Sequence, residues 1–204
     1  DTIKNIHQDI KHESIKRIFA HIKQLEQQLN TQINIIATCR QQQYGGYFSG
    51  DTHQQQQILQ QANNLGANYI DIDLAIFEQI TITNPKAKII VSYHNFHQTP
   101  SDLELREIQE QMQNNNADII KIAVMNQNQS DAKRIYSLLT HNNSQNNQIT
   151  KPQIIIGMGA EGKITRVVAP LLGSYLTFAT LDKDHNSAEG QLELSKIKLL
   201  YQQL

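Results

Sequence analysis

Short apolar runs rich in β-branched residues recur along the chain, separated by more polar stretches. Each run spans five to seven residues and lacks the strict alternation of a strand with one solvated face. Continuous apolar runs of this length are typical of parallel strands that are buried on both faces. The sequence therefore predicts strands at 33–39, 69–74, 88–93, 119–124, 154–158 and 175–180.

Between these runs, apolar residues recur three or four positions apart, which is the spacing of one helix face. The spacing is clearest from Ile15 to Leu29. A second helix start is indicated by Ser101, whose hydroxyl can accept a backbone N–H, followed by the acidic Asp102 and Glu104. We expect helices at 15–29, 101–112, 131–140 and 192–204, and a polar loop at 142–150.

Alternation of strands and helices along the whole chain predicts a parallel α/β fold. The pattern leaves two architectures open, an open doubly wound sheet and a closed barrel. Gly45 and Gly46 follow a predicted strand but lack the spacing and the following helix of a dinucleotide site. Because no phosphate-binding loop is present, the sequence favours a closed barrel over an open sheet. We expect this barrel to form a single domain over residues 1–204.

Composition narrows the classes of protein. The 204 residues suffice for one domain with a sizeable core, and a net charge of −1 does not favour nucleic acid or an anionic membrane as partner. The single cysteine, Cys39, excludes an internal disulfide and fits a reducing compartment. No apolar run approaches the ~20 residues of a membrane span, and no signal peptide is recognisable. We expect a cytoplasmic location, with the glutamine and asparagine tracts on solvated helix faces and loops.

One lysine lies inside an apolar run, where charged residues are uncommon. Lys121 is flanked by Ile120 and Ile122 in the predicted strand 119–124. Apolar surroundings disfavour a charged ammonium, and an imine-forming lysine has to react as the free amine. The alternative is a lysine at a strand end whose ammonium reaches solvent.

Other polar residues follow the predicted strands, where a barrel carries its chemistry. His94 ends the preceding strand, and an imidazole can take up and return a proton near neutral pH. Neighbouring strands are ~5 Å apart, so His94 and Lys121 could face one substrate; alternatively, His94 bonds a backbone group. Arg40 and Arg166 offer the donor fork that suits a carboxylate, or are surface charges.

Acidic and histidine residues do not predict a metal site. Asp71 and Asp73 point to the same side of a predicted strand and are expected to accept internal hydrogen bonds. No two histidines have a convincing ligand spacing, and no second thiol is available. We expect no metal.

Several segments, taken in order, resemble one enzyme family. Residues 91–100 around His94 are similar to the catalytic histidine segment of type I 3-dehydroquinate dehydratases, and residues 117–125 around Lys121 are similar to their imine-lysine segment. The resemblance continues from Met158 to Arg166, through 172–178 and through 187–191. It covers nearly the whole chain, and the motifs are specific in combination.

The resemblance implies a (β/α)8 TIM-type barrel and a hydro-lyase of the shikimate pathway of aromatic amino acid biosynthesis. Such an enzyme dehydrates 3-dehydroquinate to 3-dehydroshikimate. Carried over to this chain, Lys121 would form a Schiff base with the ring ketone, and His94 would act as general acid and base. Because the imine supplies the electron sink, neither metal nor organic cofactor is implied.

The resemblance also implies substrate contacts and an assembly. Arg166 would bind the substrate carboxylate, Arg40 would contact its hydroxyl groups, and Ser187 and Gln191 would close over it from a loop. The family is often dimeric, so a homodimer is expected, with a small molecule as the other partner.

Four departures from the family pattern concern the same site. Tyr44 stands where the family has a glutamate that orients the histidine, and Lys4 and Ile6 stand where it has a Glu-x-Arg pair. Glu189 replaces a proline of the loop that closes over the substrate. Nothing corresponds to the first strand of the family, so we expect that strand to be missing or divergent.

These departures keep two alternatives open beside an active dehydratase. One is a degenerate, weak or inactive member that acts as a binding or structural protein. The other is a different Schiff-base lysine enzyme, such as an aldolase.

Overall fold

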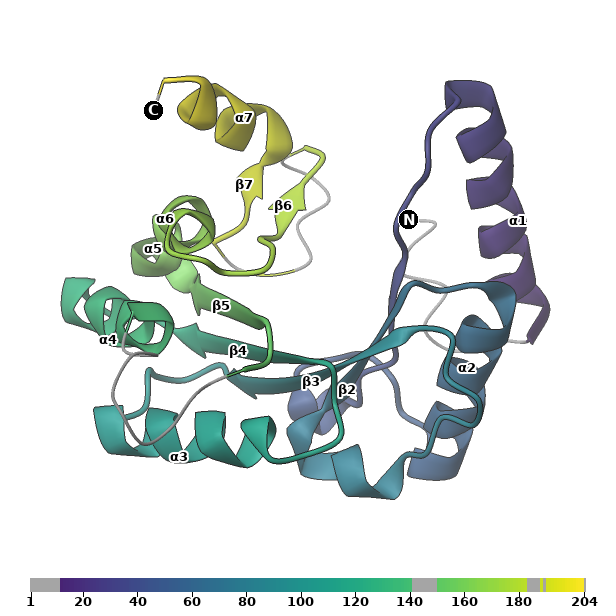
Figure 1. The fold of residues 1–204 in the computed structure, drawn as a ribbon, viewed down its shortest axis with the longest axis horizontal. Helices are drawn as coiled ribbons and strands as arrows, with labels where there is room; N and C mark the ends of the chain where they lie inside the picture. Colours follow the sequence, from purple (N-terminus) through teal and green to yellow (C-terminus); the bar gives the residue numbers. More distant parts are fainter. Residues whose placement is uncertain (1–11, 141–149, 183–187, 189, 204) are drawn as a thin grey trace. The chain divides into compact units, whose positions relative to one another are not determined.

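The computed structural model describes residues 12–140, 150–182, 188 and 190–203 (Figure 1). Strands β1 to β5 are hydrogen-bonded neighbours in chain order within one sheet, and β6 and β7 form a second, two-stranded sheet. The pairs β1–β2, β4–β5 and β6–β7 are parallel. The strands are β1 (Ile36–Thr38), β2 (Tyr69–Asp73), β3 (Lys88–Asn95), β4 (Ile119–Met125), β5 (Gln153–Met158), β6 (Ala179–Thr180) and β7 (Leu192–Glu193).

The chain divides into two compact units between Val91 and Ser92, inside β3. The first unit contains β1, β2 and the start of β3. Its core is an apolar cluster that includes Phe19, Leu59 and Ile70. Its helical elements are α1 (His12–Leu29), the 3₁₀ turn η2 (Gln42–Tyr44), α2 (Thr52–Leu65) and the 3₁₀ turn η3 (Leu74–Gln79).

Helix α2 was not predicted, because its sequence is dominated by glutamine and asparagine. Its ends are nevertheless well defined. Asp51 and Gln54 form a capping box at the start, and Gly66 ends the helix with a φ of 102°. The glutamine tract was expected to be solvated, and for Gln55 this is wrong. Its side chain is 1% exposed and its amide donates to the Cys39 carbonyl oxygen.

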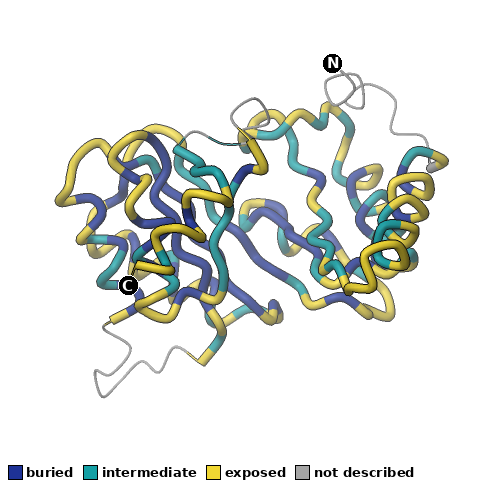
Figure 2. Tube along the Cα trace, turned by 90° about the horizontal axis from the view of Figure 1, so that it is seen from above, coloured by how far each residue is buried: buried dark blue, intermediate teal, exposed yellow. Residues whose placement is uncertain are grey.

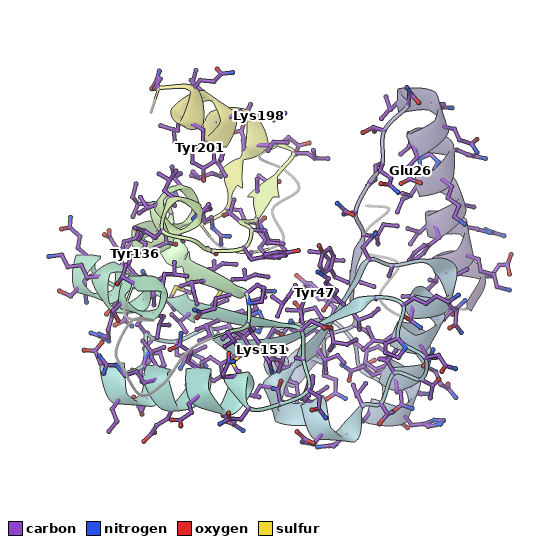
Figure 3. All side chains as sticks on the ribbon, in the orientation of Figure 1. Glu26, Tyr47, Tyr136, Lys151, Lys198 and Tyr201 are labelled. Carbon is purple, nitrogen blue, oxygen red and sulfur yellow. The ribbon has the colours of Figure 1, made fainter. Side chains whose placement is uncertain are left out.

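The second unit is built around β4 and β5, whose register pairs Lys121 with Ile154. Every residue of β5 is buried, as are the first six of β4, so both strands are dark along most of their length in Figure 2. Near the end of the chain, the hydroxyl of Tyr201 donates to the Val167 carbonyl oxygen at 2.9 Å (Figure 3). The helices are α3 (Asp102–Gln113), α4 (Gln129–Thr140), α5 (Gly159–Gly162), α6 (Thr165–Leu171) and α7 (Leu194–Gln202).

Each predicted strand overlaps an observed one, and the four predicted helices are also present. The capping box of Ser101 and Glu104 confirms the predicted start of α3. The strand expected at 175–180 is shortened to β6, because Ser174 and Tyr175 are instead bonded to β5. The helix expected from residue 192 begins at Leu194, because the two preceding residues form β7.

The predicted parallel α/β class is thus confirmed. Three other predictions are not tested by the described residues. The loop expected at 142–150 and the expected N-terminal divergence, with Lys4 and Ile6, lie almost wholly outside the described residues. A single domain over 1–204 stays a prediction. Among the helices that the structure describes, none is long and apolar enough to cross a membrane.

Candidate active site

Lys121 is the third residue of β4 and lies inside the second unit. Its residue is 9% exposed, and the strand residues on either side of it are fully buried. The lysine is therefore buried within the strand. The ammonium nitrogen Nζ lies over the ring of Phe178, 4.8 Å from the ring centroid.

His94 is the seventh residue of the eight-residue strand β3, which is the hydrogen-bonded neighbour of β4. It is half-buried, and its imidazole stacks on the ring of Phe96 with 5.8 Å between centroids and 11° between planes. Stacking orients the plane of the imidazole, a side chain whose nitrogen atoms serve in hydrogen bonding and proton transfer.

Arg166 is the most deeply buried cation of the described residues, at 2% exposure in α6. Its Nε donates to the Gly190 carbonyl oxygen at 3.0 Å, and its Nη1 donates to the Phe178 carbonyl oxygen at 3.5 Å. Burial lowers the pKa of Arg166 to about 10, which still leaves the guanidinium charged at neutral pH. A buried cation held by backbone carbonyls is suited to bind an anionic group.

The start of α6, which places Arg166, is anchored on β5. The Thr165 hydroxyl accepts a hydrogen bond from the Gly157 backbone N–H at 2.8 Å and donates to the Gly162 carbonyl oxygen at 2.6 Å. Glycine is required at two of these positions. A Cβ on Gly157 would overlap Thr165, and one on Gly162 would overlap the backbone of Gly157.

The segment predicted to close over the substrate is described only at residues 188, 190 and 191. Gly190 has a φ of 79°, and a Cβ added to it would overlap the carbonyl oxygen of Gly159. Gln191 is half-buried, and its backbone N–H donates to the Ala188 carbonyl oxygen at 3.3 Å. Ser187 lies outside the described residues. Arg166 thus holds the backbone of this segment against the end of β5.

Phe178 joins two of the predicted site residues, although the sequence alone assigned it no role. Its ring faces the Lys121 ammonium, and its carbonyl oxygen accepts from Arg166. The signal available in the sequence was an aromatic residue just before a predicted strand ends. That signal does not distinguish a site residue from a core residue.

Arg40 belongs to the first unit and makes two short ion pairs there. Its Nη2 donates to Asp71 and its Nη1 to Asp73, each at 2.7 Å, and the side chains are 12%, 3% and 9% exposed. The two aspartates thus accept internal hydrogen bonds, as predicted. Two carboxylates more than offset one guanidinium, so this cluster attracts an anion weakly and is better suited to neutral hydroxyl groups.

Tyr44 ends η2 in the first unit and packs against the apolar cluster there while half-buried. Its expected place beside His94, as a replacement for the family glutamate, stays a prediction. Within the described ranges, no three His, Cys, Asp or Glu side chains are grouped as metal ligands.

Comparison with known proteins gives one consistent family. Residues 5–204 match the family model described as Type I 3-dehydroquinase. A 3-dehydroquinate dehydratase from Coxiella burnetii is 42% identical over 173 residues, which cover 85% of this chain and 72% of that protein.

Solved structures of similar proteins agree with the sequence match. The 3-dehydroquinate dehydratase from Geobacillus kaustophilus superposes with a TM-score of 0.80 at 25% identity, covering 95% of this chain and 76% of that one. The enzyme from Aquifex aeolicus gives a TM-score of 0.75 at 27% identity, covering 97% and 83%.

The described strands and helices are of the parallel α/β class, and the likeness to these solved structures confirms the predicted TIM-type barrel fold. The similar proteins make this a barrel enzyme, a hydro-lyase. The chain belongs to the type I 3-dehydroquinase family.

Proposed function

We propose that this protein removes water from 3-dehydroquinate to give 3-dehydroshikimate, through an imine on Lys121. Membership of the family supports the reaction. The observation that carries the mechanism is the position of Lys121 within β4, where the residue is 9% exposed and its nitrogen lies over the Phe178 ring. A desolvated lysine amine is the usual nucleophile for a carbonyl substrate.

The reaction then proceeds through a nitrogen cation. The Lys121 amine adds to the ring ketone, and the adduct takes up one proton and loses one water to leave a protonated imine. This cation draws electrons from the adjacent carbon, whose C–H bond breaks as a base takes the proton and an enamine forms. The enamine electron pair expels the hydroxyl group on the next carbon, which takes a proton and leaves as water. Water finally hydrolyses the conjugated imine, so the net change is the loss of one water.

His94 is the group we assign to these proton transfers. It lies on the strand next to β4, and its stacked ring is held in one plane. As an imidazole it takes the proton from carbon and later returns it to the leaving hydroxyl. A family glutamate is replaced by Tyr44, so the imidazolium is expected to lack the stabilisation that a carboxylate would give.

The arginines and the 187–191 segment are assigned to binding. Arg166 would hold the substrate carboxylate, because it is a buried cation whose guanidinium offers a fork of N–H donors, two of them bonded to backbone carbonyls. Arg40 would contact the substrate hydroxyl groups, because its charge is already offset by Asp71 and Asp73. Ser187 and Gln191 would close over the substrate.

Two alternatives remain because of particular residues. Tyr44 favours a weak or inactive member that binds without turnover, and the buried Lys121 is equally suited to a different imine enzyme such as an aldolase. A cytoplasmic location and a homodimer stay predictions from the sequence.

Absorbance of the conjugated product tests the proposal directly. The wild-type protein should produce it from 3-dehydroquinate, Lys121→Ala should abolish the signal and His94→Ala should lower kcat about 10²- to 10⁴-fold. Lys88→Ala, which changes an exposed lysine of β3, is the control and should match wild type. A wild-type protein without product would contradict the proposal, and so would an active Lys121→Ala variant.

A further inference from the structure

The ring of Phe178 lies where the positive charge of the proposed imine would form. The Lys121 nitrogen is 4.8 Å from the ring centroid, within the ~6 Å over which an aromatic face attracts a cation. Lys121 is 9% exposed, so water screens this attraction little.

The backbone that carries the ring is held by neighbouring contacts. The Phe178 carbonyl oxygen accepts from Arg166 at 3.5 Å, and the next residue begins β6, which pairs with β7. Phe178 is itself half-buried. The ring thus already lies over the Lys121 nitrogen on an anchored backbone, as preorganised electrostatic stabilisation requires.

The charge on the Lys121 nitrogen changes during the proposed reaction. The nitrogen is neutral as the attacking amine, positive in the first imine, neutral in the enamine and positive again in the conjugated imine. An aromatic face close to that atom favours both steps that create the cation, which are water loss from the carbonyl adduct and expulsion of the hydroxyl group. It disfavours neutral states of the nitrogen by the same amount.

We propose that the face of Phe178 stabilises the protonated imine on Lys121 and thereby raises the population of the two imine intermediates. This inference rests on the proposed imine at Lys121. It assigns stabilisation of a cation to an uncharged side chain. No reagent beyond the substrate and water is involved.

Stepwise lowering of the electron density of the Phe178 ring distinguishes electrostatic stabilisation of the imine from packing by the side chain. Phe178 is replaced, through an amber codon, with mono-, di- and trifluorophenylalanine, which keep nearly the same shape while fluorine withdraws electron density from the ring face. Phe178→Leu removes the face altogether. Phe77→Leu, the same change at a half-buried ring of the first unit, is the control.

Each full-length protein is mixed with saturating 3-dehydroquinate and borohydride, and the initial rate of adduct accumulation at Lys121 is measured by mass spectrometry. Borohydride reduces the protonated imine, so this rate follows its population. We expect a stepwise fall with each fluorine and a fall of roughly two- to thirtyfold for Phe178→Leu. Phe77→Leu should match wild type.

The outcomes are distinct. Equal adduct rates across the fluorinated series would overturn the role of the ring face, even if Phe178→Leu were impaired, because shape alone would then explain the loss. A wild-type protein that forms no adduct would instead contradict the proposed function. Thermal unfolding of each variant identifies any protein that fails to fold, and the fluorinated series, which preserves shape, still gives the answer.

Discussion

Replacing Asp71 with asparagine should destabilise the first unit by an amount that follows from the ion pairs of Arg40. The change keeps the shape of the side chain but removes its charge. Asp71 is 3% exposed and accepts from Nη2 of Arg40 at 2.7 Å, while Nη1 keeps its own bond to Asp73. A hydrogen bond to a charged group contributes about 1.5–3 kcal/mol, so we expect a loss of about 2 kcal/mol in the free energy of unfolding.

Urea unfolding followed by circular dichroism measures this loss, and thermal unfolding provides a second value. For a domain of this size, 2 kcal/mol corresponds to a fall of about 4–8 °C in Tm. Asp102→Asn is the matched control, because it removes an exposed carboxylate in the first turn of α3 and should change the free energy of unfolding by less than about 0.5 kcal/mol.

A double-mutant cycle with Arg40→Met identifies the cause. Without the guanidinium, two buried carboxylates are left close together, so Asp71→Asn should become neutral or stabilising. A loss of about 2 kcal/mol in both backgrounds would refute the assignment of Asp71 to Arg40. So would a single variant that unfolds at the wild-type urea concentration.

Three further variants test the proposed binding and proton transfer. Gly190→Ala should raise KM at least about fivefold, because a non-glycine residue at this φ costs about 1 kcal/mol and its Cβ would overlap Gly159. Gly173→Ala is the control, since Gly173 has a φ of 101° with open space around it, and this variant should leave KM unchanged. Equal effects of the two variants on KM would contradict the close contact between Gly190 and Gly159. Arg166→Lys should raise KM for the substrate by about 30-fold or more, since it loses the donor fork, and an unchanged KM would remove Arg166 from the carboxylate site. His94→Gln should lower kcat about 10²- to 10⁴-fold while borohydride still traps an adduct, and loss of the adduct instead would assign His94 to imine formation.

The strands and the surroundings of Lys121 could be predicted because they depend on local sequence. A parallel strand buried on both faces requires apolar residues in succession, and 119–124 has only Lys121 as an exception. The start of α3 was also predictable, because capping by Ser101 and Glu104 involves residues three positions apart.

Helix α2 and the contacts of Phe178 depend on tertiary structure. The buried face of α2 combines Leu59 and Ala62 with Gln55 and Asn63, so hydrophobic periodicity alone does not reveal it. The two polar side chains are tolerated there because their amides bond backbone groups of neighbouring segments. Likewise, no spacing in the sequence places Phe178 over a lysine more than fifty positions earlier.

The pairing of Arg40 with two aspartates was predictable only in part. Asp71 and Asp73 were predicted to share one side of a strand, since side chains two residues apart do so. Their partner, Arg40, lies two residues beyond the end of β1, which pairs in register with β2, from Ile36 opposite Tyr69 to Thr38 opposite Asp71. The sequence therefore predicted the acceptors but not the donor, and Arg40 was assigned to the substrate alone.

Location of the covalent adduct tests the imine on Lys121 most directly. The protein is incubated with 3-dehydroquinate and borohydride, digested, and each lysine-containing peptide is examined by tandem mass spectrometry. We expect one reduced adduct, on Lys121, which disappears in Lys121→Ala and remains in the Lys88→Ala control. An adduct on any other lysine, or product formation by a protein that forms no adduct at any borohydride concentration, would contradict the proposed mechanism.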